Sequence, residues 1–322
     1  MKTKITWGVM GAAKIADKFC EAVGNNGGAV GFIASADKLR AQAFAETHGV
    51  RRFGGYEELL ADGEVNAVYI CGTNDVHCEH VLRALDAGKH VLVEKPAAVT
   101  AAQWRQMSAF ARQKGLFLME AMWSLFLPYA AAVRDSLKKI GPIRTLECDF
   151  CTSLSKISHS GVSRVYALKN YGGGLLDLGV YTVHFLNFVM NGAPDSVTAA
   201  GRLNDEKTDS LVAAVLRYGD TVAVTRTAID CAEPRGIGIY GESGQIAASA
   251  FPAPFQITVK TAEHEETIDA SFSGNGFEYE IRHTEECIAK GLSESPLLTH
   301  AATLNALLVL ERAMEQIGYG KG

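Results

Sequence analysis

Short apolar runs alternate with amphipathic segments along the first third of the chain. The apolar runs predict buried strands at residues 5–10, 30–34, 65–71, 90–93 and 115–119. Apolar positions at helical spacing predict helices between them, at residues 14–23, 38–47, 76–87 and 100–114. Strands that alternate with helices of this length build a parallel sheet covered on both faces. The pattern therefore predicts an α/β domain with a doubly wound parallel sheet.

The pattern changes beyond residue 122. A predicted helix, a strand, a polar loop and a second helix follow in turn, at residues 129–139, 143–151, 152–163 and 175–190. Strand candidates separated by turn residues come next, at residues 197–202, 210–217, 221–228, 236–240, 244–248 and 255–260. Helices at residues 276–289 and 300–316 close the chain. Strands joined by short turns are typical of antiparallel sheets.

A chain of 322 residues is long enough for two domains. We expect a first domain at residues 1–122 that contains the parallel sheet. We expect an α+β domain at residues 123–322, with a large, mostly antiparallel open sheet and helices on one of its faces.

Composition and charge exclude several classes of partner. The net charge of -5 leaves no basic stripe, which argues against nucleic acid and acidic membrane surfaces. The first residues lack a long apolar signal segment, and we find no apolar run of the ~20 residues that span a bilayer. We therefore expect a cytoplasmic protein.

The seven cysteines are scattered and odd in number, which favours reduced thiols. Cys148 and Cys151 have the spacing of a redox or zinc pair, but they lie on a predicted strand. Residues three apart on a strand point to opposite faces, so these thiols do not converge. We expect no metal site.

A glycine followed by small residues joins the first predicted strand to the first helix, in the order Gly11-Ala12-Ala13-Lys14-Ile15-Ala16. Gly11 permits a tight turn, Ala13 allows the backbone to approach a pyrophosphate, and Ala16 allows close packing of helix and strand. The helix N-terminus then offers N–H groups to the phosphates. A plain tight turn explains the motif too, but its place in a βαβ unit favours a dinucleotide.

The end of the second predicted strand bears on which dinucleotide binds. An NAD enzyme usually places a carboxylate there, about 20 residues after the glycines. Here the strand ends at Ser35, with Lys38 and Arg40 close behind. A hydroxyl and two cations suit a 2′-phosphate, so NADP is favoured over NAD. Asp37 leaves NAD open, and a solvated helix start is the alternative.

Two further segments carry candidate chemistry. Glu94 and Lys95 end a predicted strand, where a doubly wound sheet presents its ligand-binding residues. Asp177, Tyr181 and His184 share one face of the helix predicted at residues 175–190. Such groups are costly to bury unless they serve a polar cleft. A histidine at the edge of the core is the favoured interpretation of His184.

These segments resemble the glucose–fructose oxidoreductase, inositol dehydrogenase and MocA family, nearest its dimeric dihydrodiol dehydrogenase branch. The matching pieces are the Gly11 segment, Thr73-Asn74-Asp75-Val76-His77, Ala87-Gly88-Lys89-His90-Val91, Glu94-Lys95-Pro96, Met119-Glu120-Ala121-Met122-Trp123 and residues 172–181. The resemblance implies an N-terminal Rossmann domain. It also implies an NAD(P)-dependent enzyme that transfers hydride between nicotinamide and a secondary alcohol or carbonyl of a sugar, polyol or cyclic dihydrodiol.

The resemblance also implies a role for each matching residue. Thr73, Asn74 and His77 would line the nicotinamide side of the cofactor groove, with Glu94 among the cofactor contacts and Glu120 near the nicotinamide ribose. Trp123 would face the substrate. Lys95 and Tyr181 would form the catalytic pair, and Asp177 would bind or orient the substrate.

Proton chemistry agrees with this pairing. A free phenol has a pKa near 10, and a nearby ammonium stabilises the phenolate, so Lys95 is expected to make Tyr181 a better base. Lys95 can also hydrogen-bond a developing alkoxide, and either residue can be the one that moves the proton. The alternative is a cofactor-binding sensor without turnover, which has no need of the two side chains.

Two further expectations rest on the resemblance. Many members of this branch have Thr-Arg-Phe after the tryptophan, whereas this chain has Ser124-Leu125-Phe126. The missing cation argues against an anionic or strongly polar substrate. Members of the family commonly dimerise through the C-terminal sheet, so we expect a homodimer.

Overall fold

The computed structural model describes residues 5–154, 157–158 and 161–321. The first four residues and part of the loop predicted at residues 152–163 lie outside the described residues. The chain forms two compact units. The first unit comprises Met1–Ala98, Ala102–Trp123 and Ser273–His300, and the second comprises Val99–Ala101, Ser124–Phe272 and Ala301–Gly322.

The first unit contains a six-stranded parallel sheet with the strand order β3-β2-β1-β4-β5-β6. Its strands are β1 (Thr6–Met10), β2 (Ala29–Ala34), β3 (Arg52–Gly54), β4 (Ala67–Ile70), β5 (His90–Glu94) and β6 (Leu118–Ala121). Its helices are α1 (Lys14–Asn25), α2 (Lys38–Thr47), α3 (Tyr56–Ala61), α4 (His77–Asp86), α5 (Ala101–Lys114) and α8 (Phe277–Ala289). This confirms the predicted doubly wound sheet. The pattern missed only the short elements β3 and α3.

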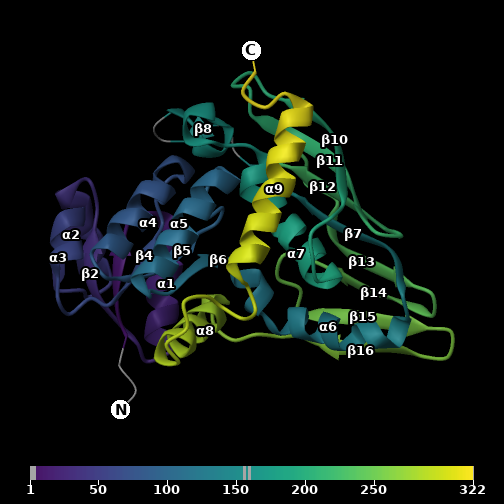
Figure 1. Ribbon diagram of the computed structural model, residues 1–322, viewed down its shortest axis with the longest axis horizontal. Coiled ribbons are helices and arrows are strands. Elements are labelled where there is room, and N and C mark those ends of the chain that lie inside the picture. The colour runs from purple at the N-terminus through teal and green to yellow at the C-terminus, as the bar shows by residue number, and fades with distance from the viewer. Residues whose placement is uncertain (1–4, 155–156, 159–160, 322) are drawn as a thin grey trace. The chain divides into compact units, whose positions relative to one another are not determined.

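Helix α8 packs against α1, although it follows the antiparallel strands in the chain (Figure 1). The indole N–H of Trp7 donates to Glu285 Oε1 at 2.9 Å, and the Asn25 amide donates to Glu278 Oε1 at 2.8 Å. The hydrophobic pattern placed this helix in the second domain. By its contacts it belongs to the first unit.

The second unit contains an eight-stranded sheet with the order β10-β11-β12-β7-β13-β14-β15-β16. Its strands are β7 (Ile143–Cys151), β10 (Ser196–Leu203), β11 (Asp209–Tyr218), β12 (Thr221–Ala228), β13 (Arg235–Gly241), β14 (Gly244–Ser249), β15 (Gln256–Thr261) and β16 (Glu265–Asp269). Only β7 and β12 pair in parallel, which confirms the mostly antiparallel sheet. Strand β16 was missed, as was the hairpin of β8 (Ile157–Ser158) and β9 (Gly161–Val162) within the predicted loop.

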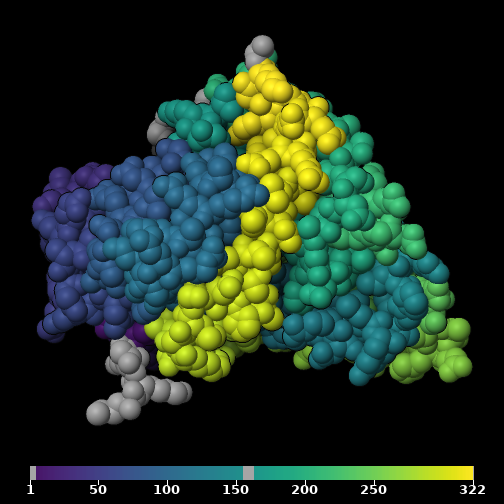
Figure 2. All heavy atoms as spheres, in the orientation of Figure 1, coloured from purple at the N-terminus to yellow at the C-terminus, as the bar shows by residue number. Residues whose placement is uncertain are grey.

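Three helices cover one face of this sheet: α6 (Pro128–Ile140), α7 (Val180–Met190) and α9 (His300–Ile317) (Figure 1). Leu146, Cys148 and Phe150 alternate along β7 toward these helices and are buried. Figure 2 shows the atoms of α9, in yellow, on the visible face of the molecule. In the described part of this unit, no helix covers the opposite face of the sheet.

One helical stretch, Leu168–Met190, has the length and composition of a membrane span, with a mean hydropathy of 1.2. Within its most apolar window of 18 residues, 83% is buried inside the structure. Its apolar residues therefore pack inside the second unit, as those of a core helix do.

Candidate active site

The turn after β1 has the backbone shape that a dinucleotide requires. Gly11 adopts φ +122°, and a Cβ there would lie 3.1 Å from the carbonyl oxygen of Cys71. Ala12 is buried, and Ala13 caps α1 without a side-chain hydrogen bond. Lys14 and Ile15 form the first turn of α1, with Lys14 exposed. The N–H groups of this turn can therefore serve a phosphate, and the residues present fit the cofactor.

Some side chains after β2 are engaged within the protein, and others can contact a cofactor. The Asp37 carboxylate caps α2 by accepting the N–H of Leu39 at 2.9 Å. Lys38 forms an ion pair with Glu58 at 2.6 Å. Ser35 is buried and Arg40 is exposed. Burial raises the pKa of the Cys71 thiol, and the Arg40 charge opposes this rise. The sulfur of Cys71 lies 3.0 Å from the Gly11 carbonyl oxygen.

The loop after β4 is tied to the segment after β5. Thr73 and the buried Asn74 begin a short 3-10 turn, Asn74–Val76. His77 is 1% exposed, and its Nδ1 lies 2.9 Å from the carbonyl oxygen of Pro96. His77 Nε2 lies 3.2 Å from the carbonyl oxygen of Gly72. The ring therefore links the two loops, a role that its sequence position did not reveal.

Glu94 is fixed from two sides at the end of β5. The Tyr69 hydroxyl donates to Glu94 Oε1 at 2.5 Å, and the backbone N–H of Lys95 donates to Oε2 at 3.2 Å. Burial and the Glu94 charge raise the pKa of Tyr69, so this phenol remains the donor. Lys95 is half-buried. Glu94 therefore positions the backbone of Lys95.

Two predicted residues lie at the C-terminal end of β6, Glu120 within the strand and Trp123 just after it. Glu120 is fully buried, and its Oε1 accepts the backbone N–H of Ala97 at 2.9 Å, which holds the segment after Lys95. Trp123 is half-buried, and its ring lies 5.5 Å from that of Phe277 in α8. Both residues thus lie at the end of the strand next to β5.

The parallel sheet brings all the predicted cofactor residues to one edge. Gly11, Ser35, Thr73, Glu94 and Glu120 follow or end β1, β2, β4, β5 and β6, and the carboxyl ends of parallel strands meet at one edge. The strand order reverses between β1 and β4. That point is where open α/β sheets bind their ligands.

The helix of Asp177 and Tyr181 differs from the prediction in its first turn. Residues Leu175–Gly179 form a π-helix, and α7 begins at Val180. Hydrogen bonds in a π turn close from residue i to i+5, so the α-helical spacing assumed for Asp177, Tyr181 and His184 does not hold across it. Such turns are frequent at functional sites.

The side chains of this helix lie in different surroundings. Tyr181 is 8% exposed, and its ring meets that of Phe150 edge-on at 5.7 Å. The Asp177 side chain is 14% exposed, and its Oδ1 lies 3.6 Å from Arg164 Nη2. His184 is buried within the unit. Arg164 was not predicted. It supplies a cation near Asp177, whereas Leu125 stands where many members of the branch have an arginine.

Two buried carboxyl groups also escaped the sequence pattern. Glu280 of α8 is fully buried, and neither carboxyl oxygen has a hydrogen-bond partner among the described residues. Burial and the Glu94 charge raise the pKa of Glu280 well above its ordinary value. Asp209, which begins β11, is also fully buried and contacts the start of the Asp177 helix. Both acids lie among other polar residues in the sequence, so no local pattern signalled their burial.

All seven cysteines are free thiols, and Cys148 and Cys151 are both buried. Among the described residues, no group of three or more His, Cys, Asp or Glu side chains could hold a metal ion.

Comparison with known proteins decides the family. Residues 5–122 match the family model described as an oxidoreductase family with an NAD-binding Rossmann fold, and residues 132–247 match the GFO/IDH/MocA C-terminal domain. The chain belongs to the GFO/IDH/MocA family. Within it, trans-1,2-dihydrobenzene-1,2-diol dehydrogenase of Xenopus laevis is 34% identical over 99% of both chains. The enzyme of that name from Mus musculus is 34% identical over 98% of this chain and 97% of its own.

Solved structures agree with this membership. A 3-ketoreductase from Actinomadura kijaniata, in complex with NADP and TDP-benzene, superimposes with a TM-score of 0.87 at 27% identity over 98% of both chains. Levoglucosan dehydrogenase, in complex with NADH and levoglucosan, shares the fold, with a TM-score of 0.88 at 18% identity over 98% of both chains. This GFO/IDH/MocA protein is an oxidoreductase that uses a nicotinamide dinucleotide. The enzyme hypothesis is therefore confirmed over the sensor.

Proposed function

We propose that the protein is an NADP(H)-preferring dehydrogenase or reductase that acts on a secondary alcohol or carbonyl of a cyclic dihydrodiol, sugar or polyol. The observation that carries this proposal is full-length similarity, at 34% identity, to enzymes named for a dihydrodiol. The neighbouring structures named for a ketoreductase and for levoglucosan dehydrogenase extend the substrate class to sugars.

Lys95 and Tyr181 are the proposed proton-handling pair. The bound nicotinamide ring supplies or accepts the hydride, so the substrate oxygen must gain or lose a proton. Lys95 hydrogen-bonds that oxygen as its charge develops, and Tyr181 exchanges the proton with it. Asp177 orients the substrate through a second hydroxyl. Trp123 contributes an aromatic face for the ring of the substrate.

The preference for NADP rests on the start of α2. Asp37 is engaged as a helix cap, and Lys38 is engaged with Glu58. Arg40 is exposed, and its backbone N–H lies in the first turn of α2, where Asp37 accepts it at 3.4 Å. Ser35 and Arg40 are therefore the groups available for a 2′-phosphate.

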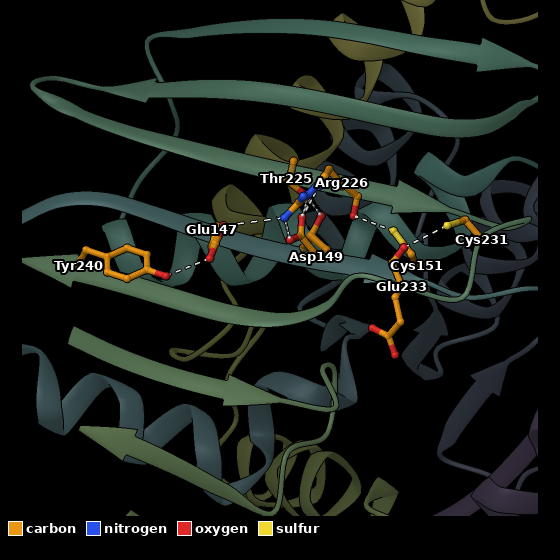
Figure 3. Close-up of polar contacts among 9 residues, drawn as sticks. Glu147, Asp149, Cys151, Thr225, Arg226, Cys231, Glu233 and Tyr240 are labelled. Carbon is orange, nitrogen blue, oxygen red and sulfur yellow. Dashed lines mark hydrogen bonds and ion pairs between the residues drawn. The ribbon is translucent and has the colours of Figure 1, made fainter. Parts of the chain in front are cut away.

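We propose that the protein is a cytoplasmic homodimer in which the open faces of two eight-stranded sheets meet. Val215, Val222 and Tyr240 are 44%, 40% and 37% exposed. Arg226 lies among Asp149 and Glu147 near the centre of the sheet, and Tyr240 donates to Glu147 (Figure 3). The charged groups are already paired within one chain. The apolar side chains around them can therefore be buried by a second copy without leaving a buried charge unpaired.

Turnover in two variants tests the site. A screen of aldoses, inositols, anhydro sugars, α-dicarbonyls and dihydrodiols, followed by the absorbance of the reduced cofactor, first supplies a substrate. Lys95→Met and Tyr181→Phe should then each lower kcat by about 10²- to 10⁴-fold, because each removes a group that handles the proton. Lys138→Met and Tyr56→Phe are matched controls and should keep wild-type kcat. Undiminished turnover in both site variants would refute the assignment.

A further inference from the structure

The start of the Asp177 helix is held by residues from three other parts of the second unit. The backbone N–H of Gly173 donates to the Val165 carbonyl oxygen at 2.6 Å. The Tyr319 hydroxyl, beyond α9, donates to the Gly172 carbonyl oxygen at 2.7 Å. Asp209 Oδ2 accepts the N–H of Leu175, the first residue of the π turn, at 2.7 Å.

Asp209 fills the space that the glycines leave. Gly173 adopts φ +110°, and a Cβ there would collide with Asp209 Oδ1. A Cβ on Gly174 would lie 3.1 Å from Asp209 Oδ2. The carbonyl oxygen of Gly173 in turn accepts the N–H of Asp177 at 3.1 Å. The carboxyl group thus connects through one short turn to the backbone of Asp177.

No cation neutralises Asp209 among the described residues. It is 0% exposed, and its Oδ1 has no hydrogen-bond partner there. The charged pair of this region is Arg164 and Asp177, whose Nη2 and Oδ1 atoms lie 3.6 Å apart. Burying a carboxylate without a counter-charge is costly, so the neutral acid is favoured.

We propose that Asp209 is a positioning residue for Asp177 and Tyr181, and that it acts as a neutral carboxylic acid. The proposal deepens the proposed function and rests on it for the roles of Asp177 and Tyr181. Removal of the carboxyl group leaves the N–H of Leu175 without its acceptor and leaves an empty space beside Gly173 and Gly174. The π turn at Leu175–Gly179 is then no longer held in one position. A displacement of about 1 Å at a catalytic side chain can cost about 10²-fold in rate.

The same cluster makes the contact pH-dependent. Burial raises the pKa of Asp209 to about 7, against the lowering effect of the N–H groups of Leu175 and Gly174. The neighbouring phenol is that of Tyr319, and burial, followed by the charges of Asp209 and Tyr171, raises its pKa. Asp209 is therefore the group of this cluster that titrates near neutrality. Asp209 holds its proton more tightly when the turn at residues 172–175 is closed around it than when the turn is open and the carboxyl group is solvated. Rising pH therefore favours the open turn between the ordinary pKa of 3.8 and about 7.

Hydrogen exchange of the amides at residues 172–179 tests this without a substrate. In the wild-type protein, their protection, corrected for intrinsic exchange, should fall between pH 5 and pH 7 and then level off. Asp209→Asn keeps the shape and the acceptor without the charge, so its protection should stay at the low-pH level throughout. Asp209→Ala should exchange faster at every pH. Asp195→Ala, which removes a similar contact at 2.7 Å to the N–H of Gly219, is the matched control and should leave these amides unchanged.

Turnover supplies the second readout. Asp209→Ala should lower kcat by about 10²-fold while the Kd for NADPH stays unchanged, and Asp209→Asn should restore wild-type kcat. Wild-type kcat in the alanine variant, equal damage in both variants, or flat wild-type protection from pH 5 to pH 8 would each overturn the proposal. If Lys95→Met and Tyr181→Phe retain activity but the exchange pattern holds, the catalytic assignment fails and the placement of the helix by Asp209 stands.

Discussion

The Tyr69 hydroxyl donates a 2.5 Å hydrogen bond to Glu94, one residue before Lys95, and Glu280 acts electrostatically on both partners. The strands supply Tyr69 and Glu94, whereas Glu280 comes from α8, late in the chain. Two carboxyl groups in a dry interior do not both ionise readily, so one keeps its proton. Glu280, fully buried and without a hydrogen-bond partner among the described residues, is the one that keeps it.

Replacement of Glu280 by Gln should change how stability depends on pH. Burial and the Glu94 charge raise the pKa of Glu280 above 4.5, so the folded protein binds this proton more tightly than the unfolded chain does. The contribution of this site to stability therefore falls as pH rises above about 4.5, and Glu280→Gln removes that fall. The difference in Tm, variant minus wild type, should increase from pH 4.5 to pH 8 in thermal melts.

Glu278, on the same helix, provides a control of opposite sign. Burial raises the pKa of Glu278, but hydrogen bonds from Asn25 and from backbone N–H groups outweigh it, and the pKa is lowered. This carboxylate stabilises the fold above pH 4.5, and that contribution is lost as pH falls through its lowered pKa. Glu278→Gln should therefore be destabilising at neutral pH and nearly neutral in acid. Parallel trends in the two variants would contradict both assignments.

Removal of the Arg40 guanidinium should reduce the preference for NADPH. A hydrogen bond to a charged group is worth about 1.5–3 kcal/mol, so Arg40→Ala should raise the Kd for NADPH by about 10- to 100-fold and leave that for NADH unchanged. Fluorescence titration of both cofactors measures this. Arg51→Ala, at another exposed arginine, is the control. Tighter binding of NADH than of NADPH by the wild-type protein would refute the assignment of Ser35 and Arg40.

Truncation of Phe251 should destabilise the second unit. Its ring is fully buried and lies 5.9 Å from that of Phe150 and 5.6 Å from that of Phe185, both edge-on. Phe251→Ala leaves a cavity and should lower the free energy of unfolding by about 3–5 kcal/mol in a urea titration. Phe255→Ala, at an exposed ring that stacks on Phe272, should cost about 1 kcal/mol. Equal losses in the two variants would show that the aromatic cluster does not hold this unit together.

A charge on the open sheet face should dissociate the proposed dimer. Val222 is 40% exposed there, and Val222→Asp would bury a carboxylate in the dimer without a partner. Sedimentation velocity should show a monomer for this variant and a dimer for the wild type. Leu39→Asp, at an exposed apolar side chain of α2, should remain dimeric. A wild-type monomer at micromolar concentration would overturn the proposal.

Local pattern was sufficient for most of the strands and helices and for the edge of the sheet where the cofactor residues lie. Gly11 and Glu94 could be placed because each one terminates a strong apolar run, whereas Glu120 was placed only by the family resemblance. Strand β3 and helix α3 were missed because Arg52–Gly54 and Tyr56–Ala61 are too short to show a period.

The missed site features depend on contacts between distant segments. The π turn at Leu175–Gly179 is held in part by Asp209, 34 residues away. The electrostatic interaction of Glu280 with Glu94 and Tyr69 depends on the packing of α8, and no local sequence pattern predicts it. Arg164 lies beside Asp177 because the chain folds back there. Residues such as these become visible only once tertiary structure assembles them.

The return of α8 to the first unit has a consequence for biosynthesis. Trp7 and Glu285 are joined by a hydrogen bond, yet the ribosome adds them to the chain 278 residues apart. A nascent chain that ends at residue 122 still lacks the helix that covers α1. The nucleotide-binding half therefore completes its packing only after the antiparallel half has been synthesised, and an isolated fragment of residues 1–122 would expose the surface that α8 covers.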